Sequence, residues 1–147
     1  MTDNPLTGIF DRVSATYDRV GVDFFQPIAD GLLAHLSPRS GDRALDVGCG
    51  RGAVLFPLAR AVAPVGTALA IDVSPGMVEA TASEAASLGL AVDVRVGDAV
   101  LAGDTGSFDL VASSLVLFFL RDPVAALRTW LDHLVPGGRV GISTFGA

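Results

Sequence analysis

The residues with the clearest chemical potential form a short glycine-rich segment with an acidic residue beside it. Gly48, Gly50 and Gly52 follow the apolar run Ala44–Val47, which contains Asp46. Glycine can adopt positive φ and leaves room for a ligand to approach the backbone. Apolar residues at helical spacing follow, so the free N–H groups of a helix start would face the same place. Strand, glycine loop and helix together predict the start of a nucleotide-binding βαβ unit.

The spacing of these glycines is compatible with two kinds of cofactor. Gly48, Gly50 and Ala53 fit the permissive dinucleotide pattern, which binds a pyrophosphate. Gly48, Gly50 and Gly52 form a different pattern with Asp46 just before it, and a carboxylate there favours a cationic ligand over an anion. An ordinary glycine turn of an α/β protein is the third interpretation.

A second acidic residue ends the next apolar run. In Thr67–Val73 the polar residue is Asp72, twenty residues after Gly52, where a carboxylate can accept hydrogen bonds from a ribose diol. Ser74–Pro75 should cap and start the following helix. Met77, near the start of that helix, either lines an adenine pocket or packs in the core.

Periodicity along the chain predicts the elements that must position these residues. We expect helices over residues 5–20, 22–36, 52–62, 75–88 and 122–134, and strands over 44–47, 67–73, 91–96, 108–114 and 140–145. This alternation predicts an α/β fold, a Rossmann-like doubly wound, mostly parallel sheet of about five strands. Residues 1–40 should form an N-terminal helical lid and residues 41–147 the ligand-binding core. Pro57 should kink the helix over 52–62 in its second turn.

Composition excludes several classes of function. The chain has 147 residues, half of them apolar, and a net charge of −6, which argues against a nucleic-acid partner. It contains no apolar run near the roughly 20 residues of a membrane span and no secretory signal pattern, so we expect a cytoplasmic protein. One cysteine excludes an internal disulfide, and the histidines and cysteine are too few for a metal cluster.

Several motifs, in order along the chain, carry a family resemblance. The segment DVGCGRG at 46–52 resembles the first motif of class I S-adenosylmethionine-dependent methyltransferases, and Gly97–Ala99 resembles the motif whose acidic residue meets the adenine amine. Leu134–Val140 resembles the turn that precedes their fifth strand. The residues after Ser114 resemble their fourth motif, except that Phe118–Phe119 replaces a histidine pair, which suggests an apolar pocket wall.

The N-terminal region extends the resemblance. FDRVSATYDRVGVDFF, from residue 10 to 25, is similar to methyltransferases of ubiquinone and menaquinone biosynthesis, where a pair matching Tyr17–Asp18 lies in a lid near the cofactor. A packed surface helix is the alternative. The resemblance implies S-adenosyl-L-methionine as cofactor and the following binding residues: Tyr17, Asp46, Gly48, Cys49, Gly50, Gly52, Asp72, Val73, Met77, Gly97, Asp98, Ala99, Ser114 and Leu115.

The resemblance also implies an activity, although no catalytic residue stands out. His35 and His133 lie in unsuitable places, and Cys49 fits a small loop residue better than a nucleophile. We expect methyl transfer to a small-molecule acceptor of apolar character. One alternative is a non-catalytic cofactor-binding module, a partner subunit or a non-methylating enzyme on the same fold. The other is an NAD-dependent oxidoreductase domain, against which the complete absence of lysine argues.

The chain ends shortly after the fifth expected strand. The resemblance implies two more strands, so we expect either a fragment of a longer chain or a covered edge. The strand over 140–145 would then be an open edge, covered by a homodimer partner or by a C-terminal segment.

Overall fold

The structure is a computed structural model and describes residues 8, 25–100 and 106–146. The expected helix over 5–20 and the Tyr17–Asp18 pair lie outside these residues. The elements are α2 (Phe25–Leu36), β1 (Arg43–Val47), α3 (Leu55–Val62), β2 (Thr67–Asp72), α4 (Pro75–Ser87), β3 (Asp93–Val96), β4 (Phe108–Ser114), the 3₁₀ turn η1 (Leu117–Phe119), α5 (Pro123–Asp132) and β5 (Leu134–Ser143).

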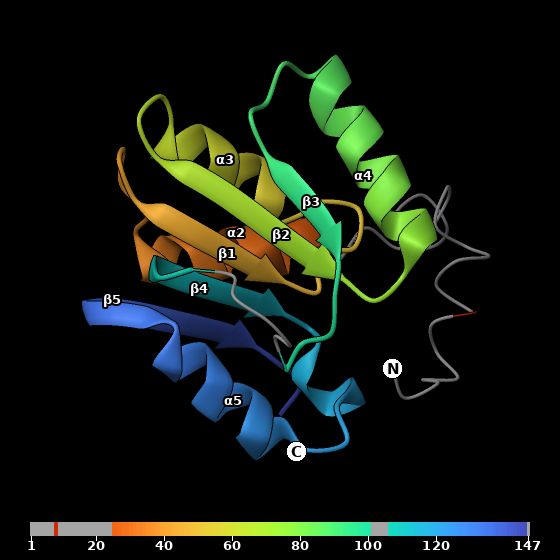
Figure 1. Cartoon of the computed structure of the whole chain (residues 1–147), viewed down its shortest axis with the longest axis vertical. Helices are drawn as coiled ribbons and strands as arrows, with labels where there is room; N and C mark the ends of the chain where they lie inside the picture. Colours follow the sequence, from red (N-terminus) through yellow and green to blue (C-terminus); the bar gives the residue numbers. More distant parts are fainter. Residues whose placement is uncertain (1–7, 9–24, 101–105, 147) are drawn as a thin grey trace.

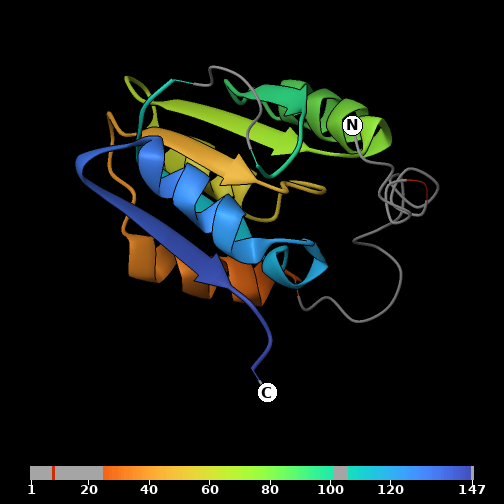
Figure 2. The same ribbon diagram turned by 60° about the horizontal axis from the view of Figure 1, so that its bottom comes forward.

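The five strands form one parallel sheet in the order β3-β2-β1-β4-β5. Helices α2, α3 and α4 pack on one face and α5 on the other (Figure 1, Figure 2). The chain reverses its direction of travel across the sheet between β1 and β4, and doubly wound sheets bind ligands at the carboxyl ends of the strands at such a point. The predicted Rossmann-like fold is confirmed.

Side-chain size distinguishes the two faces of the sheet. Towards α2 and α3 the central strands present the buried alanines Ala44, Ala68, Ala70 and Ala112. Towards α5 they present the larger Leu45, Val47, Leu69, Ile71 and Val111, which surround the fully buried Trp130. Small side chains let helices approach the sheet closely, whereas larger ones fill the space beneath a single helix.

The central strands end within one residue of their predicted ends, while the strands at the edges differ more. β3 begins at Asp93, not Ala91, and the Asp93 carboxylate pairs with Arg95 at 2.6 Å on the exposed side. β5 begins at Leu134, not 140, because residues 135–138 form a register shift between the pairs Phe108–Leu134 and Leu110–Arg139.

The predicted kink at Pro57 is wrong. Helix α3 starts at Leu55, so Pro57 is its third residue and lies in the first turn. Proline is tolerated there because the N–H groups of a first turn have no partner within the helix.

Helix α2 packs onto the sheet beside β4 and β5. Its residues Ala29, Leu32 and Leu36 are buried in the same cluster as the alanines of the central strands. Arg139 of β5 donates through Nε to the Leu36 carbonyl oxygen at 2.6 Å and pairs with Asp42 at 2.9 Å. A lid boundary at residue 40 stays a prediction. Within the described ranges, no helix has the length and apolar character needed to cross a membrane.

The position of β5 generates the first prediction. β5 is an edge strand, and within the described part of the chain no strand pairs with its outer side. We expect the 147-residue chain to self-associate, or to bind a second polypeptide, because unpaired strand groups act as a template for another strand. Light scattering across a concentration series measures this. A concentration-independent monomer of 15.1 kDa would contradict it.

Candidate functional site

The carboxyl ends of four parallel strands bring the predicted site residues together. The glycine loop 48–52 follows β1, Asp72–Ser74 ends β2, Gly97–Ala99 follows β3, and Ser114–Leu115 ends β4. Of the residues predicted for the site, Tyr17 alone lies outside the described ranges.

The glycine loop is held mainly by the end of β2. The N–H groups of Gly48 and Cys49 both donate to the Ile71 carbonyl oxygen, at 2.8 and 3.0 Å. The N–H of Gly50 donates to Asp72 Oδ2 at 2.9 Å. The loop therefore sits above the β2 end in one defined conformation.

Asp72 also connects this loop to helix α4. Its Oδ1 accepts a hydrogen bond from the Ser74 N–H at 3.0 Å, and Ser74 Oγ accepts one from the Met77 N–H at 3.1 Å. This is the helix cap that the sequence predicted. Met77 is 1% exposed, so its side chain packs in the core here, and a contact with a cofactor stays a prediction.

The three loop glycines serve different purposes. A Cβ at Gly48 would overlap the Val116 side chain, and a Cβ at Gly52 would lie 2.7 Å from the Phe56 ring. At Gly50, whose φ is +50°, a Cβ would meet nothing within 4 Å. The protein's own packing thus requires the outer two glycines, whereas the space at Gly50 is open to a ligand.

Two buried carboxyl groups lie beneath this loop. Asp46 is 1% exposed and Asp72 is 9% exposed, and both are on the same face of neighbouring strands because Asp46 pairs with Ala70. Burial first, and then repulsion from Asp72, raise the pKa of Asp46 to about 8. Its Oδ2 has no hydrogen-bond partner. A positive charge above the pair would stabilise the ionised form of Asp46.

The segment after β3 presents a third carboxyl group. Asp98 is exposed, and its Oδ1 accepts a hydrogen bond from the Val100 N–H at 3.0 Å. Gly97 donates to the Asp72 carbonyl oxygen at 2.9 Å, and the Ala99 carbonyl accepts from the buried Trp130 Nε1–H at 2.7 Å. These bonds hold the segment, and the rest of the Asp98 carboxylate faces solvent at the edge.

The end of β4 closes the other side of the site. Ser114 Oγ lies 2.7 Å from Ser143 Oγ, and the N–H of Leu115 donates to the Ser143 carbonyl at 2.9 Å. Leu115 has φ of +58°, which is uncommon for a residue with a side chain and often occurs at functional sites. The next residue, Val116, lies against Gly48.

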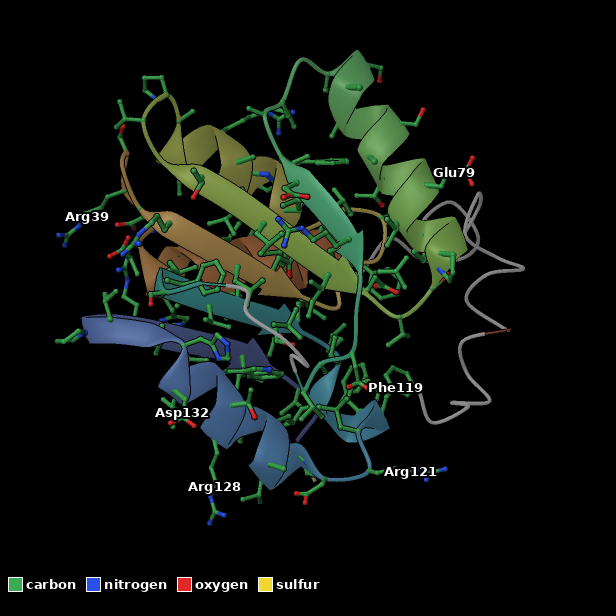
Figure 3. The ribbon with its side chains drawn as sticks, viewed as in Figure 1. Arg39, Glu79, Phe119, Arg121, Arg128 and Asp132 are labelled. Carbon is green, nitrogen blue, oxygen red and sulfur yellow. The ribbon has the colours of Figure 1, made fainter. Side chains whose placement is uncertain are left out.

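Three phenylalanines form an exposed group beyond this end of the sheet, here called the aromatic wall: Phe118, Phe119 and Phe145. They are 47%, 37% and 61% exposed. The Phe118 ring centroid is 4.4 Å from that of Phe119 and 5.4 Å from that of Phe145. Phe119 lies on the turn between β4 and α5 (Figure 3). Exposed apolar patches of this kind commonly mark binding surfaces.

Helix α4 makes two contacts with the loop that the sequence analysis missed. Thr81 Oγ1 donates to the Gly50 carbonyl oxygen at 2.5 Å, and Arg51 Nη2 lies 2.9 Å from Glu84 Oε2. The available signal was that Thr81 follows Met77 by one helical turn, so the two share a face.

Helix α2 makes a third such contact. Gln26 Nε2 donates to the Ala53 carbonyl oxygen at 2.9 Å. That carbonyl would accept from the N–H of residue 57 in a regular helix, but Pro57 has none. Because Pro57 cannot donate to it, the Ala53 carbonyl oxygen accepts from Gln26, and this bond attaches α2 to the end of the loop.

The described residues offer little conventional acid–base or metal chemistry. No group of three metal-ligating side chains occurs among them. Burial raises the pKa of the Cys49 thiol well above its usual value, so the nucleophilic thiolate is disfavoured. His35 lies in the last turn of α2 and His133 precedes β5, both towards the amino ends of the strands and away from the site.

The pKa of Asp46 generates a stability prediction. The folded state keeps the Asp46 proton up to about pH 8, whereas the unfolded chain loses it near the ordinary aspartate pKa of 3.8. The wild-type protein should therefore lose free energy of unfolding as pH rises through this window. Asp46→Asn removes that loss, so from pH 6 to pH 9 the variant should gain roughly 3 kcal/mol of unfolding free energy relative to wild type.

Denaturant unfolding at both pH values measures this difference. Asp132→Asn, the same change at an exposed position of α5, is the matched control and should follow the wild-type pH dependence (Figure 3). Parallel stability curves for Asp46→Asn and wild type would show that Asp46 does not take up a proton on folding.

Comparison with known proteins agrees with this geometry. Nocamycin O-methyltransferase of Saccharothrix syringae is 48% identical, with 92% of this chain and 49% of the relative covered. Aklanonic acid methyltransferase DauC of Streptomyces sp. (strain C5) is 44% identical, with 95% and 64% covered. The crystal structure of the [4+2]-cyclase SpnF superposes with a TM-score of 0.82 at 25% identity, over 96% of this chain and 60% of that one.

The chain thus spans between about half and two thirds of the length of these relatives. Residues 45–142, from β1 to β5, match the family described as a methyltransferase domain. The match decides between the two cofactors that the glycine spacing left open, in favour of S-adenosylmethionine. The chain belongs to the methyltransferase domain family, as the class I motifs indicated.

Proposed function

We propose that this chain is the cofactor-binding part of an S-adenosylmethionine-dependent methyltransferase that acts on an apolar, ring-containing small molecule. The observation that carries the proposal is the open space at Gly50 above the buried carboxyl groups of Asp46 and Asp72. S-Adenosylmethionine carries an ammonium and a sulfonium group, so its methionine end suits such an acidic floor.

The three carboxyl groups near the strand ends each contact a different part of the cofactor. Asp46 faces the positive methionine end, where a cation would offset its repulsion with Asp72. Each oxygen of Asp72 accepts a backbone N–H, and a carboxylate oxygen can accept more than one hydrogen bond, so the same group suits the ribose diol. Asp98 accepts from the exocyclic amine of adenine, a charge-assisted bond that selects this base.

The cofactor, when bound, supplies the methyl group to an acceptor nucleophile. The chain's own contribution is to orient the donor and exclude water. Both histidines lie at the far end of the sheet. An acceptor oxygen that ionises readily, such as that of a phenol or a carboxylic acid, would need no histidine base from this part of the chain.

The aromatic wall supports an apolar acceptor. Clustered phenyl rings stack well on flat ring systems, and these three side chains are exposed in part. Two relatives are methyltransferases whose names contain a small molecule, nocamycin and aklanonic acid. Since this chain spans only part of those relatives, the activity and acceptor are proposed for the whole protein.

A non-methylating reaction on the same fold is the second candidate. It is favoured by the similarity to SpnF, which is named a [4+2]-cyclase. In that case the cofactor would bind but not be consumed. A cytoplasmic location, and a homodimer or C-terminal segment on the β5 edge, stay predictions.

Gly50→Ala tests the cofactor site. The new methyl group should occupy the ligand's space and weaken S-adenosylmethionine binding at least tenfold, measured by calorimetry. Gly89→Ala is a matched control, because Gly89 also has positive φ, at +69°, and nothing within 4 Å of a Cβ, but it lies between α4 and β3. Both variants carry a similar backbone cost. Equal affinity in the two would remove the loop from the site.

Phe119→Ala tests the aromatic wall, with aklanonic acid as the probe acceptor and S-adenosylhomocysteine as the measured product. We expect a KM for the acceptor raised several-fold and an unchanged Kd for the cofactor, because the lost ring contacts the acceptor alone. Leu131→Ala, at an exposed position of α5, is the control. Cofactor binding without turnover of any acceptor in a panel would support the non-methylating alternative instead.

A further inference from the structure

The hydroxyl group of Thr81 is fully buried and bonded to the glycine loop. Thr81 is 0% exposed, and its Oγ1 lies 2.5 Å from the Gly50 carbonyl oxygen. The N–H of the same glycine donates to Asp72 Oδ2. Both backbone polar groups of Gly50 are therefore bonded to side chains, one on α4 and one at the end of β2.

The peptide that Thr81 holds is the central unit of a turn. The N–H of Gly52 donates to the Cys49 carbonyl oxygen at 2.9 Å, which closes a turn over residues 49–52. Gly50 has φ of +50° and Arg51 does not have positive φ, as in a type II′ turn. Rotating the Gly50–Arg51 peptide would convert it towards type I′, which needs positive φ at both residues.

We propose that Thr81 is a positioning residue of the cofactor site, whose hydroxyl keeps the Gly50–Arg51 peptide in the orientation that leaves the space at Gly50 open. This inference rests on the proposed cofactor site. Without the hydroxyl, the part-buried Gly50 carbonyl oxygen would keep only the weak thiol donor Cys49 Sγ, at 3.8 Å. The peptide would then tend to rotate and present its oxygen to the ligand space.

A second contact from the same helix supports this role of α4. Glu84, three residues after Thr81, pairs with the side chain of Arg51, the second residue of the Gly50–Arg51 peptide. The Arg51 side chain is 8% exposed and that of Glu84 is 34% exposed, so part of this pair is open to solvent and screened. Of these two contacts of α4 with the loop, the hydrogen bond from the buried Thr81 hydroxyl is the less exposed to solvent.

The test compares Thr81→Val, which keeps the shape but removes the hydroxyl, with Thr81→Ser, which keeps the hydroxyl. Calorimetry with S-adenosylmethionine should give a Kd about tenfold higher for the valine variant and near the wild-type value for the serine variant. Thr129→Val is the matched control, because Thr129 also donates to a carbonyl, that of Ala125 at 3.0 Å, but on α5.

A readout without ligand separates this inference from the proposed function. Amide hydrogen exchange in the ligand-free protein should be faster at residues 50–52 in Thr81→Val than in wild type or Thr129→Val. Should Thr81→Val fail to fold, Thr81→Ala makes the same comparison. If wild type itself binds no S-adenosylmethionine, the proposed function fails, and exchange at the loop alone decides whether Thr81 orients it.

Two results would overturn the inference. One is a valine variant that binds within twofold of wild type and shows unchanged exchange at the loop. The other is a serine variant that binds as weakly as the valine variant, since the effect would then come from lost packing and not from the hydroxyl.

Discussion

The carboxylate of Asp72 accepts one backbone hydrogen bond on each oxygen, and the site depends on this arrangement. One bond fixes Gly50 in the loop after β1, and the other fixes Ser74 at the start of α4. The parallel pairing of β1 with β2 makes the arrangement possible, because it brings the end of β2 directly beside the loop. A side chain proposed to bind ligand is therefore also part of the framework that shapes the binding site.

The small residues on one face of the sheet explain how a carboxyl group can lie so deep. Asp46 shares its face with Ala44, Ala70 and Ala112, over which α2 and α3 pack closely. Water is excluded, so the pKa of Asp46 rises and the group is neutral near pH 7. An apolar residue would pack there at lower cost. The chain thus carries a destabilising group beneath its glycine loop, which agrees with the proposed binding site because functional sites often reduce stability.

The sequence predicted the central elements well and the tertiary contacts poorly. The buried strands ending at Val47, Asp72 and Ser114 are mostly apolar on both faces, which is the expected pattern for parallel strands covered on both sides. The edges were less accurate, since the start of β5 depends on a register shift against β4 that leaves no local pattern. The bond from Thr81 to Gly50 spans 31 residues and the bond from Gln26 to Ala53 spans 27, so no periodicity could predict either.

A glycine loop that binds a ligand must be both open and rigid, and glycine provides only the first. The missing Cβ at Gly50 leaves space, but glycine loses more conformational freedom on folding than any other residue. Rigidity has to come from the surroundings, and here it comes from several elements. The end of β2 binds the N–H groups of the loop, α4 binds the Gly50 carbonyl, and α2 binds the carbonyl that Pro57 leaves free. The contacts are spread over distant parts of the sequence because Gly48, Gly50 and Gly52, three of the five loop residues, have no side chains with which to make them.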